Sequence, residues 1–205
     1  LKVRPPRLLN PTPFQADRFG SAVAALGTDR LIVGALGDDT GAPDSGAVYL
    51  FGTNRSLLAT IPNPSPASED NFGASVAALG SDHIIVGVPK DNTGATRAGA
   101  AYLFNANGTL LTTITNPTPQ SAEEFGISVA AVGSDAVLIG AWGENNTSVF
   151  SSGAAYLYST NGNLLTTFTN PTPGVGDSFG RSVASLGNDR VIIGASGAVS
   201  AVIGA

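Results

Sequence analysis

A repeat with a fixed period constrains the fold of this chain more than any other feature. The pair Phe-Gly occurs at 19–20, 72–73, 125–126 and 179–180, so successive copies are 53, 53 and 54 residues apart. A second marker keeps the same step, since Asn-Pro-Thr-Pro or Asn-Pro-Ser-Pro begins at Asn10, Asn63, Asn116 and Asn170. A period of this length is typical of propellers and other repeat arrays. We therefore expect each copy to be one supersecondary unit that packs against its neighbours.

Each unit has the composition of four short β-strands joined by turns. In the first unit, alternating small and branched residues predict a first strand at 21–26, and an apolar run at 31–35 predicts a second strand buried on both faces. A longer polar loop precedes a third strand, expected at 46–51, and a Leu- and Thr-rich fourth strand ends the unit. No window has a helical period of convincing length, so the chain is predicted to be all-β.

Stacking of such sheets predicts a single domain of 205 residues, a β-propeller of about four four-stranded antiparallel blades. The predicted units are approximately 14–66, 67–119, 120–173 and 174–205, the last completed by residues 1–13. The last unit lacks a fourth strand, and residues 1–9 occupy that position in the repeat, so the N-terminal strand is a candidate to close the ring. The alternatives are a fragment of a larger propeller and units completed by a neighbouring chain.

The composition excludes several kinds of chemistry. The chain has no cysteine, which removes disulfides and thiolate sites, and one histidine, which leaves a single possible base for a nucleophile–base triad. The net charge of −5 gives no basic footprint for nucleic acid. No apolar run is long enough to cross a membrane. We therefore predict no nucleic-acid binding, no membrane span and no enzymatic activity.

The order of the segments that recur in each unit resembles the FG-GAP repeat. This family includes the β-propeller of integrin α subunits and many secreted bacterial proteins. The matching segments are Phe-Gly, then Ser-Val-Ala-Ala, then Ile-Val-Gly-Ala, then Gly-Ala-Val-Tyr-Leu-Phe, and the resemblance covers roughly residues 14–195. Four copies in register make it specific. The resemblance implies a propeller, an extracellular or cell-surface location, and binding or adhesion rather than catalysis.

The resemblance does not extend to the calcium loop of many family members. That loop, of the type D-x-D-x-D-G, lies between the first and second strands, where this chain has short turns with one acidic residue each: Asp29, Asp82, Asp135 and Asp189. Calcium takes six to eight oxygen ligands, which one carboxylate in a hairpin cannot supply. These aspartates are expected to cap their turns instead, as Asx residues commonly do. In this respect the chain is closer to bacterial variants with short turns than to integrins.

Most other acidic residues fall in the loops before the first strand and between the second and third strands, which up-and-down order places on one rim. The candidate ligand-binding residues there are Asp38, Asp39, Asp44, Asp91, Asn92, Trp142, Glu144 and Asn145. Loops on one face of a scaffold commonly carry ligands; the competing interpretation is that they are solvated turns that keep the protein soluble. Asp38, Asp39 and Asp44 form the local oxygen cluster that could hold calcium, the one cofactor considered. Trp142 could stack on a sugar ring or fill the space between blades.

These patterns lead to one functional hypothesis and two alternatives. We predict a non-enzymatic, extracellular or cell-surface binding or adhesion module whose rim loops contact a glycan or an extracellular protein. The first alternative is a structural repeat protein of a surface layer or filament, assembled by self-association through open blade edges. The second is an enzyme, which no constellation of residues supports.

Overall fold

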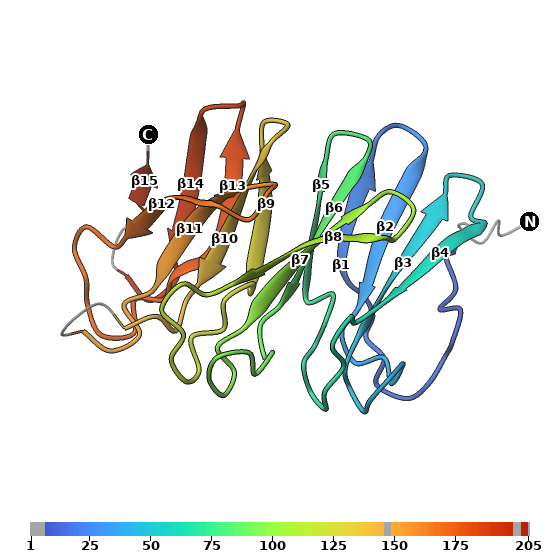
Figure 1. Ribbon diagram of the computed structural model, residues 1–205, viewed down its shortest axis with the longest axis horizontal. Coiled ribbons are helices and arrows are strands. Elements are labelled where there is room, and N and C mark those ends of the chain that lie inside the picture. The colour runs from blue at the N-terminus through green and yellow to red at the C-terminus, as the bar shows by residue number, and fades with distance from the viewer. Residues whose placement is uncertain (1–6, 146–148, 199–201, 205) are drawn as a thin grey trace, which may run out of the picture.

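The computed structural model describes residues 7–145, 149–198 and 202–204, and Figure 1 shows its architecture. Within these ranges the chain forms fifteen strands in four antiparallel sheets, which we call blades one to four, and no helix long and apolar enough to cross a membrane. Blade one contains β1 (Phe19–Leu26), β2 (Arg30–Ala35), β3 (Ala47–Gly52) and β4 (Leu57–Pro62). Blade two contains β5 (Ser75–Leu79), β6 (His83–Val88), β7 (Ala100–Asn105) and β8 (Leu110–Thr115). Blade three contains β9 (Ser128–Val132), β10 (Ala136–Ala141), β11 (Ala154–Ser159) and β12 (Leu164–Thr169). Blade four contains β13 (Phe179–Leu186), β14 (Arg190–Ala195) and β15 (Val202–Gly204).

Each blade is a meander in which neighbouring strands follow one another in sequence. The all-β prediction with propeller-type blades is confirmed, and the predicted strands of the first unit are right to within a residue or two. The main difference is that β1 begins at Phe19, because the Phe-Gly pair joins the strand across an irregularity between Phe19 and Ala22.

Blades one and two lie in one half of the view in Figure 1, and blades three and four overlap in the other half. Contacts between first strands join the blades in chain order, β1 to β5, β5 to β9 and β9 to β13. The array is open, since blade four has three strands within the described residues and residues 7–10 form no strand. Leu8 instead packs against the blade-one cluster that contains Val33 and Tyr49. Residues 1–6, on which most of the predicted ring closure depends, lie outside the described residues, and the exact unit boundaries stay a prediction.

Burial follows the position of each strand in its blade. In blades one to three the second and third strands are mostly buried, as their continuous apolar runs predict, whereas the fourth strands β4, β8 and β12 are largely exposed. In blade four, only Val191 and Ile193 of β14 are buried. The first strands β1, β5, β9 and β13 pack against one another from blade to blade. Their small residues suit this crowded position. The core therefore lies between blades rather than within one sheet.

Glycines allow the backbones of neighbouring blades to touch. A Cβ atom on Gly87 of β6 would lie 1.9 Å from the carbonyl oxygen of Gly126 in blade three, and the same contact recurs between Gly34 and Gly73 and between Gly140 and Gly180. Parallel bridges add a second contact, joining Gly99 to Phe125 and Gly153 to Phe179. We call the set of these contacts between two neighbouring blades a junction. The repeated Phe-Gly pair and the glycine of the second strand are thus two sides of one packing arrangement.

The phenylalanine of each Phe-Gly pair fills the space at a junction. Phe125 is fully buried, and its ring centroid lies 5.7 Å from that of Tyr156 and 6.1 Å from that of Tyr158. The same hydrophobic cluster contains Leu79 and Ile85 of the preceding blade. The ring of Phe125 therefore packs in a cluster to which both blades contribute, and it couples blade three to blade two.

Candidate functional site

Backbone hydrogen bonds hold the two loops of the predicted rim together in every blade. In blade two, the amide of Lys90 donates to the carbonyl oxygen of Asp70, so the loop after β6 is fixed against the loop before β5. Equivalent bonds join Gly37 to Asp17, Gly143 to Glu123 and Gly197 to Asp177. The predicted clustering of these loops at one rim is therefore seen in the structure, and it brings one carboxylate from each loop into the same neighbourhood.

A buried polar cluster lies beneath the rim of each of the first three blades. In blade two, Asp70 Oδ2 accepts hydrogen bonds from Asn63 Nδ2 at 2.9 Å and from the amide of Ala67 at 2.7 Å. Asp91 Oδ2 accepts a bond of 3.0 Å from the hydroxyl of Tyr102. Both aspartates are at most 3% exposed. The cluster thus consists of the marker asparagine, one carboxylate from each loop, and a tyrosine of the third strand.

The same partners recur in the other blades. In blade one the members are Asn10, Asp17, Asp38 and Tyr49, and in blade three they are Asn116, Glu123, Glu144 and Tyr156. Blade four retains the bond from Asn170 to Asp177. Sequence reasoning missed the asparagines and tyrosines. The signal was present, because the marker asparagine always precedes its acidic partner by 7 residues.

The predicted site residues divide into two groups with different roles. Asp38, Asp91 and Glu144 are buried members of the polar clusters. Their sequence neighbours close the loops instead: Asp39, Asn92 and Asn145 each accept a hydrogen bond of 2.9 Å from a backbone amide five or six residues further along the loop. The eight predicted residues therefore lie on one rim, but most of them hold its loops in shape.

Asp38, Asp39 and Asp44 do not form the shared oxygen cluster that the sequence suggested. Asp38 turns inward to Tyr49, whereas the Asp39 carboxylate accepts the amide of Asp44. Among the described residues, no group of three or more acidic or histidine side chains is placed to hold a metal ion. The three carboxylates are close in the sequence but do not share a site, because neighbouring residues of the loop point in different directions.

The turns between first and second strands hold single acidic residues, as the sequence indicated. Their contacts differ from the expected backbone caps, since Asp29 lies 3.5 Å from Arg30 and Asp189 lies 3.7 Å from Arg190. Both aspartate side chains are largely exposed, so these ion pairs contribute little to stability.

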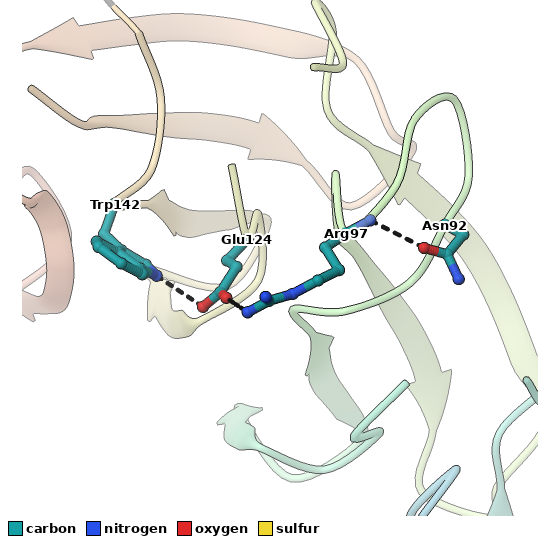
Figure 2. Close-up of polar contacts among 4 residues, drawn as sticks. All are labelled: Asn92, Arg97, Glu124 and Trp142. Atoms are coloured by element: carbon teal, nitrogen blue, oxygen red, sulfur yellow. Dashed lines mark hydrogen bonds and ion pairs between the residues drawn. The ribbon is translucent and has the colours of Figure 1, made fainter. Parts of the chain in front are cut away.

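Trp142 follows β10 at the rim, and its indole nitrogen points toward Glu124, which in turn points toward Arg97 (Figure 2). Its Nε1 donates a hydrogen bond of 2.7 Å to Glu124, and the other carboxylate oxygen of Glu124 pairs with Arg97 of blade two. The guanidinium of Arg181, in blade four, lies 5.0 Å above the centre of the indole ring. The amide of Arg97 is in turn held by Asn92. The half-buried indole therefore links blades, and one of its faces is covered by a cation.

A cavity of about 220 Å³ opens beside this tryptophan. We call it the rim pocket, and its principal lining residues are Arg97, Glu124, Trp142, Asn145 and Phe150. Phe150 is 70% exposed, so its ring is accessible to a ligand at the pocket. A second cavity of about 300 Å³ also has Asn145 in its lining, together with Glu144 and Tyr156.

The two glutamates of the blade-three cluster are electrostatically coupled. Burial raises the pKa of Glu123 to about 7, and the negative charge of Glu144 adds to this effect. Burial also raises the pKa of Glu144. Asn116 Nδ2 donates to both carboxyl groups, at 2.7 Å and 3.2 Å, which keeps them close together. Two carboxylates so placed hold a proton more readily than isolated ones.

The raised pKa of Glu123 predicts a pH-dependent contribution to stability that Glu123→Gln removes. The pKa of Glu123 is raised in the folded chain, so its contribution is present below the ordinary pKa and is lost as the pH rises through about 7. We expect the wild type to lose about 2 kcal/mol of unfolding free energy relative to Glu123→Gln between pH 5 and pH 8. Urea denaturation at both pH values measures this, with Glu69→Gln, an exposed site, as the control. Equal pH dependence in wild type and Glu123→Gln would contradict the coupling.

Comparison with solved structures identifies the fold. The structure of U3-55K aligns with a TM-score of 0.59 and 9% identity, over 89% of this chain and 47% of that chain. A crystal structure of the eukaryotic initiation factor aligns with a TM-score of 0.47 and 12% identity, over 79% of this chain and 35% of that chain. At such identities the first likeness shows the fold alone. This chain thus spans less than half the length of either protein, and no match was found among curated protein sequences.

The repeat itself is matched by a family model. The FG-GAP repeat model matches three times, at residues 14–51, 60–104 and 111–158. Each segment begins before the Phe-Gly pair and ends in the third strand of its blade, and together they contain the Phe-Gly pairs of blades one to three and the complete polar clusters of blades two and three. They cover more than half of the sequence, so the chain belongs to the FG-GAP repeat family.

Proposed function

We propose that this chain is a non-enzymatic binding module of an extracellular or cell-surface protein, and that it binds a glycan at the rim pocket. FG-GAP repeats are found in extracellular and adhesion-type propeller domains, and the family is generally non-enzymatic. The observation that carries the proposal is the pocket itself. It combines the indole of Trp142 and an exposed phenylalanine with charged and amide groups on a rigid rim.

The chemistry of the pocket suits a sugar. A sugar ring has an apolar face, which packs on aromatic side chains, and hydroxyl groups, which need hydrogen-bond partners. Trp142 and Phe150 supply apolar surface, and the side chain of Arg97 is 46% exposed, so its guanidinium can reach a ligand in the pocket. Glu124 orients both Trp142 and Arg97 through its two oxygens. A preorganised site of this kind lowers the entropic cost of binding.

A glycan array probed with wild-type protein and two pocket variants tests the proposal. We expect wild-type binding to a restricted set of glycans, and a loss of at least tenfold in affinity on Trp142→Ala and on Phe150→Ala, about 1.4 kcal/mol or more. Phe150 is exposed and its side chain has no hydrogen-bonding role, so its variant separates loss of binding from loss of folding. Phe14→Ala, which removes an exposed phenylalanine of another loop, is the matched control.

Two results would refute the proposal. The absence of any bound glycan would exclude this class of ligand and leave a protein ligand to be sought at the same rim. Unchanged binding in both Trp142→Ala and Phe150→Ala would show that a glycan binds elsewhere.

A further inference from the structure

Blade four exposes apolar side chains that the other blades bury. Leu186, at the end of β13, is 51% exposed, and Ile192 of β14 is 40% exposed. At these two positions of blades one to three the residues are at most 6% exposed: Leu26, Leu79, Val132, Ile32, Ile85 and Leu138. All six lie in the hydrophobic clusters that each blade shares with the next. Leu186 and Ile192 therefore form one half of a junction, and no described residue supplies the other half. We call this surface the blade-four face.

Blade one exposes the opposite half of a junction. Val23 of β1 is 69% exposed, whereas its equivalent Val129 in blade three is 9% exposed and lies in the cluster shared with blade two. Phe19 is only partly buried, although the phenylalanines of the other three Phe-Gly pairs are at most 2% exposed. In blades two to four these positions pack against the preceding blade. We call the surface around Phe19 and Val23 the blade-one face.

The glycines of both faces leave the space that a junction needs. In blades one to three, a Cβ on the second-strand glycine would lie 1.9 to 2.2 Å from a carbonyl oxygen of the next blade. At Gly194, the equivalent in blade four, the nearest atoms all belong to Ser182 of the same blade. A Cβ on Gly20, the Phe-Gly glycine of blade one, would meet nothing within 4 Å. The backbone of another blade can therefore approach both glycines.

A hydrogen bond that joins the inner blades has its donor and acceptor on these two faces. Ser75 Oγ donates a bond of 2.8 Å to the carbonyl oxygen of Gly126, the Phe-Gly glycine of the next blade. Ser128 Oγ donates an equivalent bond to the carbonyl oxygen of Gly180. Ser182 holds the donor position on the blade-four face, and Gly20 holds the acceptor position on the blade-one face. The two faces are thus complementary in polar groups as well as in shape.

We propose that a second copy of this chain covers these surfaces, with its blade-one face packed on the blade-four face of the first copy. The contact repeats a junction that the chain itself forms three times, and Leu186 and Ile192 of one copy meet Phe19 of the other. Burial of these apolar side chains drives the association. Because the two faces differ, the contact is heterologous, and successive copies either close a ring or continue the array.

Two variants that each block one face test the contact and its direction. Val23→Lys places a charge on the blade-one face, and Leu186→Lys places one on the blade-four face. Both side chains are more than half exposed, so the blades should still fold, which circular dichroism checks. Light scattering at chain concentrations up to about 100 μM should show dimers or larger assemblies of the wild type. Each variant alone should associate at least tenfold more weakly.

An equimolar mixture of the two variants gives the sharper result. One intact face of each kind remains in the mixture, so we expect a dimer of one copy of each variant and nothing larger. Leu165→Lys is the matched control, because Leu165 is 54% exposed on β12, outside both faces. This control should associate as the wild type does.

Disulfide cross-linking locates the contact, since the chain has no cysteine of its own. In the junction of blades three and four, a Cβ on Gly133 would lie 3.7 Å from that of Asn188, a distance that a disulfide can span. Gly187 of blade four and Thr28 of blade one hold the equivalent positions on the two faces. Oxidation of the double variant Gly187→Cys with Thr28→Cys should therefore join separate copies. Gly133→Cys with Asn188→Cys should close within one chain, and Thr28→Cys alone measures chance collisions.

Three results would overturn the proposal. The first is a wild type that has the mass of one chain at every concentration. The second is a bond between Cys residues placed at Gly187 and Thr28 that forms within one chain, since its own blade one would then cover blade four. The third is undiminished association of Val23→Lys or of Leu186→Lys alone, which would show that two identical faces meet or that the contact lies elsewhere.

Discussion

Replacement of Gly99 by alanine is expected to lower the free energy of unfolding by about 3 kcal/mol or more, from two separate causes. Gly99 has a φ of +87°, a conformation that costs an L-residue roughly 1–2 kcal/mol. The new Cβ would also lie 2.1 Å from the carbonyl oxygen of Phe125 and 2.6 Å from its nitrogen. Both obstacles are backbone atoms of the next blade, so a side-chain rotation cannot relieve the clash, and the bridge between Gly99 and Phe125 must open.

Gly80→Ala is the matched control, because it has the backbone cost without the clash. Gly80 has a φ of +59°, and a Cβ placed there would meet no atom within 4 Å. We expect this variant to lose only about 1 kcal/mol. Urea denaturation of both variants measures the difference. If the two substitutions cost the same, strain in the left-handed conformation alone would account for the loss at Gly99, and close approach between blades would contribute nothing.

Phe125→Ala is expected to lower the free energy of unfolding by about 4 kcal/mol. This is the largest loss that we predict for the truncation of a side chain. Phe125 is fully buried, and it contacts Tyr156 and Tyr158 of its own blade. Its cluster extends to Leu79 in blade two, so truncation leaves a cavity between blades rather than within one. Rigid strands on both sides limit how far that cavity can collapse, which is the condition for a large loss.

Two further variants make this expectation specific. Phe14→Ala removes a phenylalanine that is 72% exposed and should change stability by less than about 0.5 kcal/mol. Phe125→Leu keeps much of the buried volume and should lie between the two. Chemical denaturation monitored by circular dichroism compares all three. A loss at Phe125 no larger than the loss at Phe14 would mean that blade three does not depend on this ring for its packing.

The repeat and the strand pattern could be predicted because both are local properties of the sequence. The apolar run at β6 indicates a strand buried on both faces, and that is what the structure shows. The open shape of the array could not be predicted in this way. The curvature of a propeller accumulates from small rotations at each junction, and the positions of Gly87 and Gly126 show that a junction exists without giving its angle.

The candidate site was predicted at the level of the rim but not of its atoms. Acidic loops pointed correctly to one rim, yet the grouping of Asp38 with Asp39 was misleading, since only Asp38 turns toward the core. Its true neighbour Tyr49 lies 11 residues further along the chain. Such pairings depend on how two strands and two loops fold over one another, which periodicity does not reveal. Trp142 combines both interpretations of the sequence, since it contacts neighbouring blades and also lines the rim pocket.

The junction between blades also determines how the stability of this chain is distributed. Three hydrophobic clusters are each shared by two neighbouring blades, and the two inner blades take part in two of them each. A fourth cluster lies in blade one alone. Nearest-neighbour coupling of this kind makes stability a sum over contacts between units rather than over units. Inserting one more repeat would therefore add one interface between blades. Deleting an inner blade would bring into contact two blades that are not neighbours in this structure. Every junction pairs the glycine of one second strand with the Phe-Gly pair of the next blade. A duplicated repeat would therefore meet complementary surfaces on both sides, and the array could lengthen without a new core.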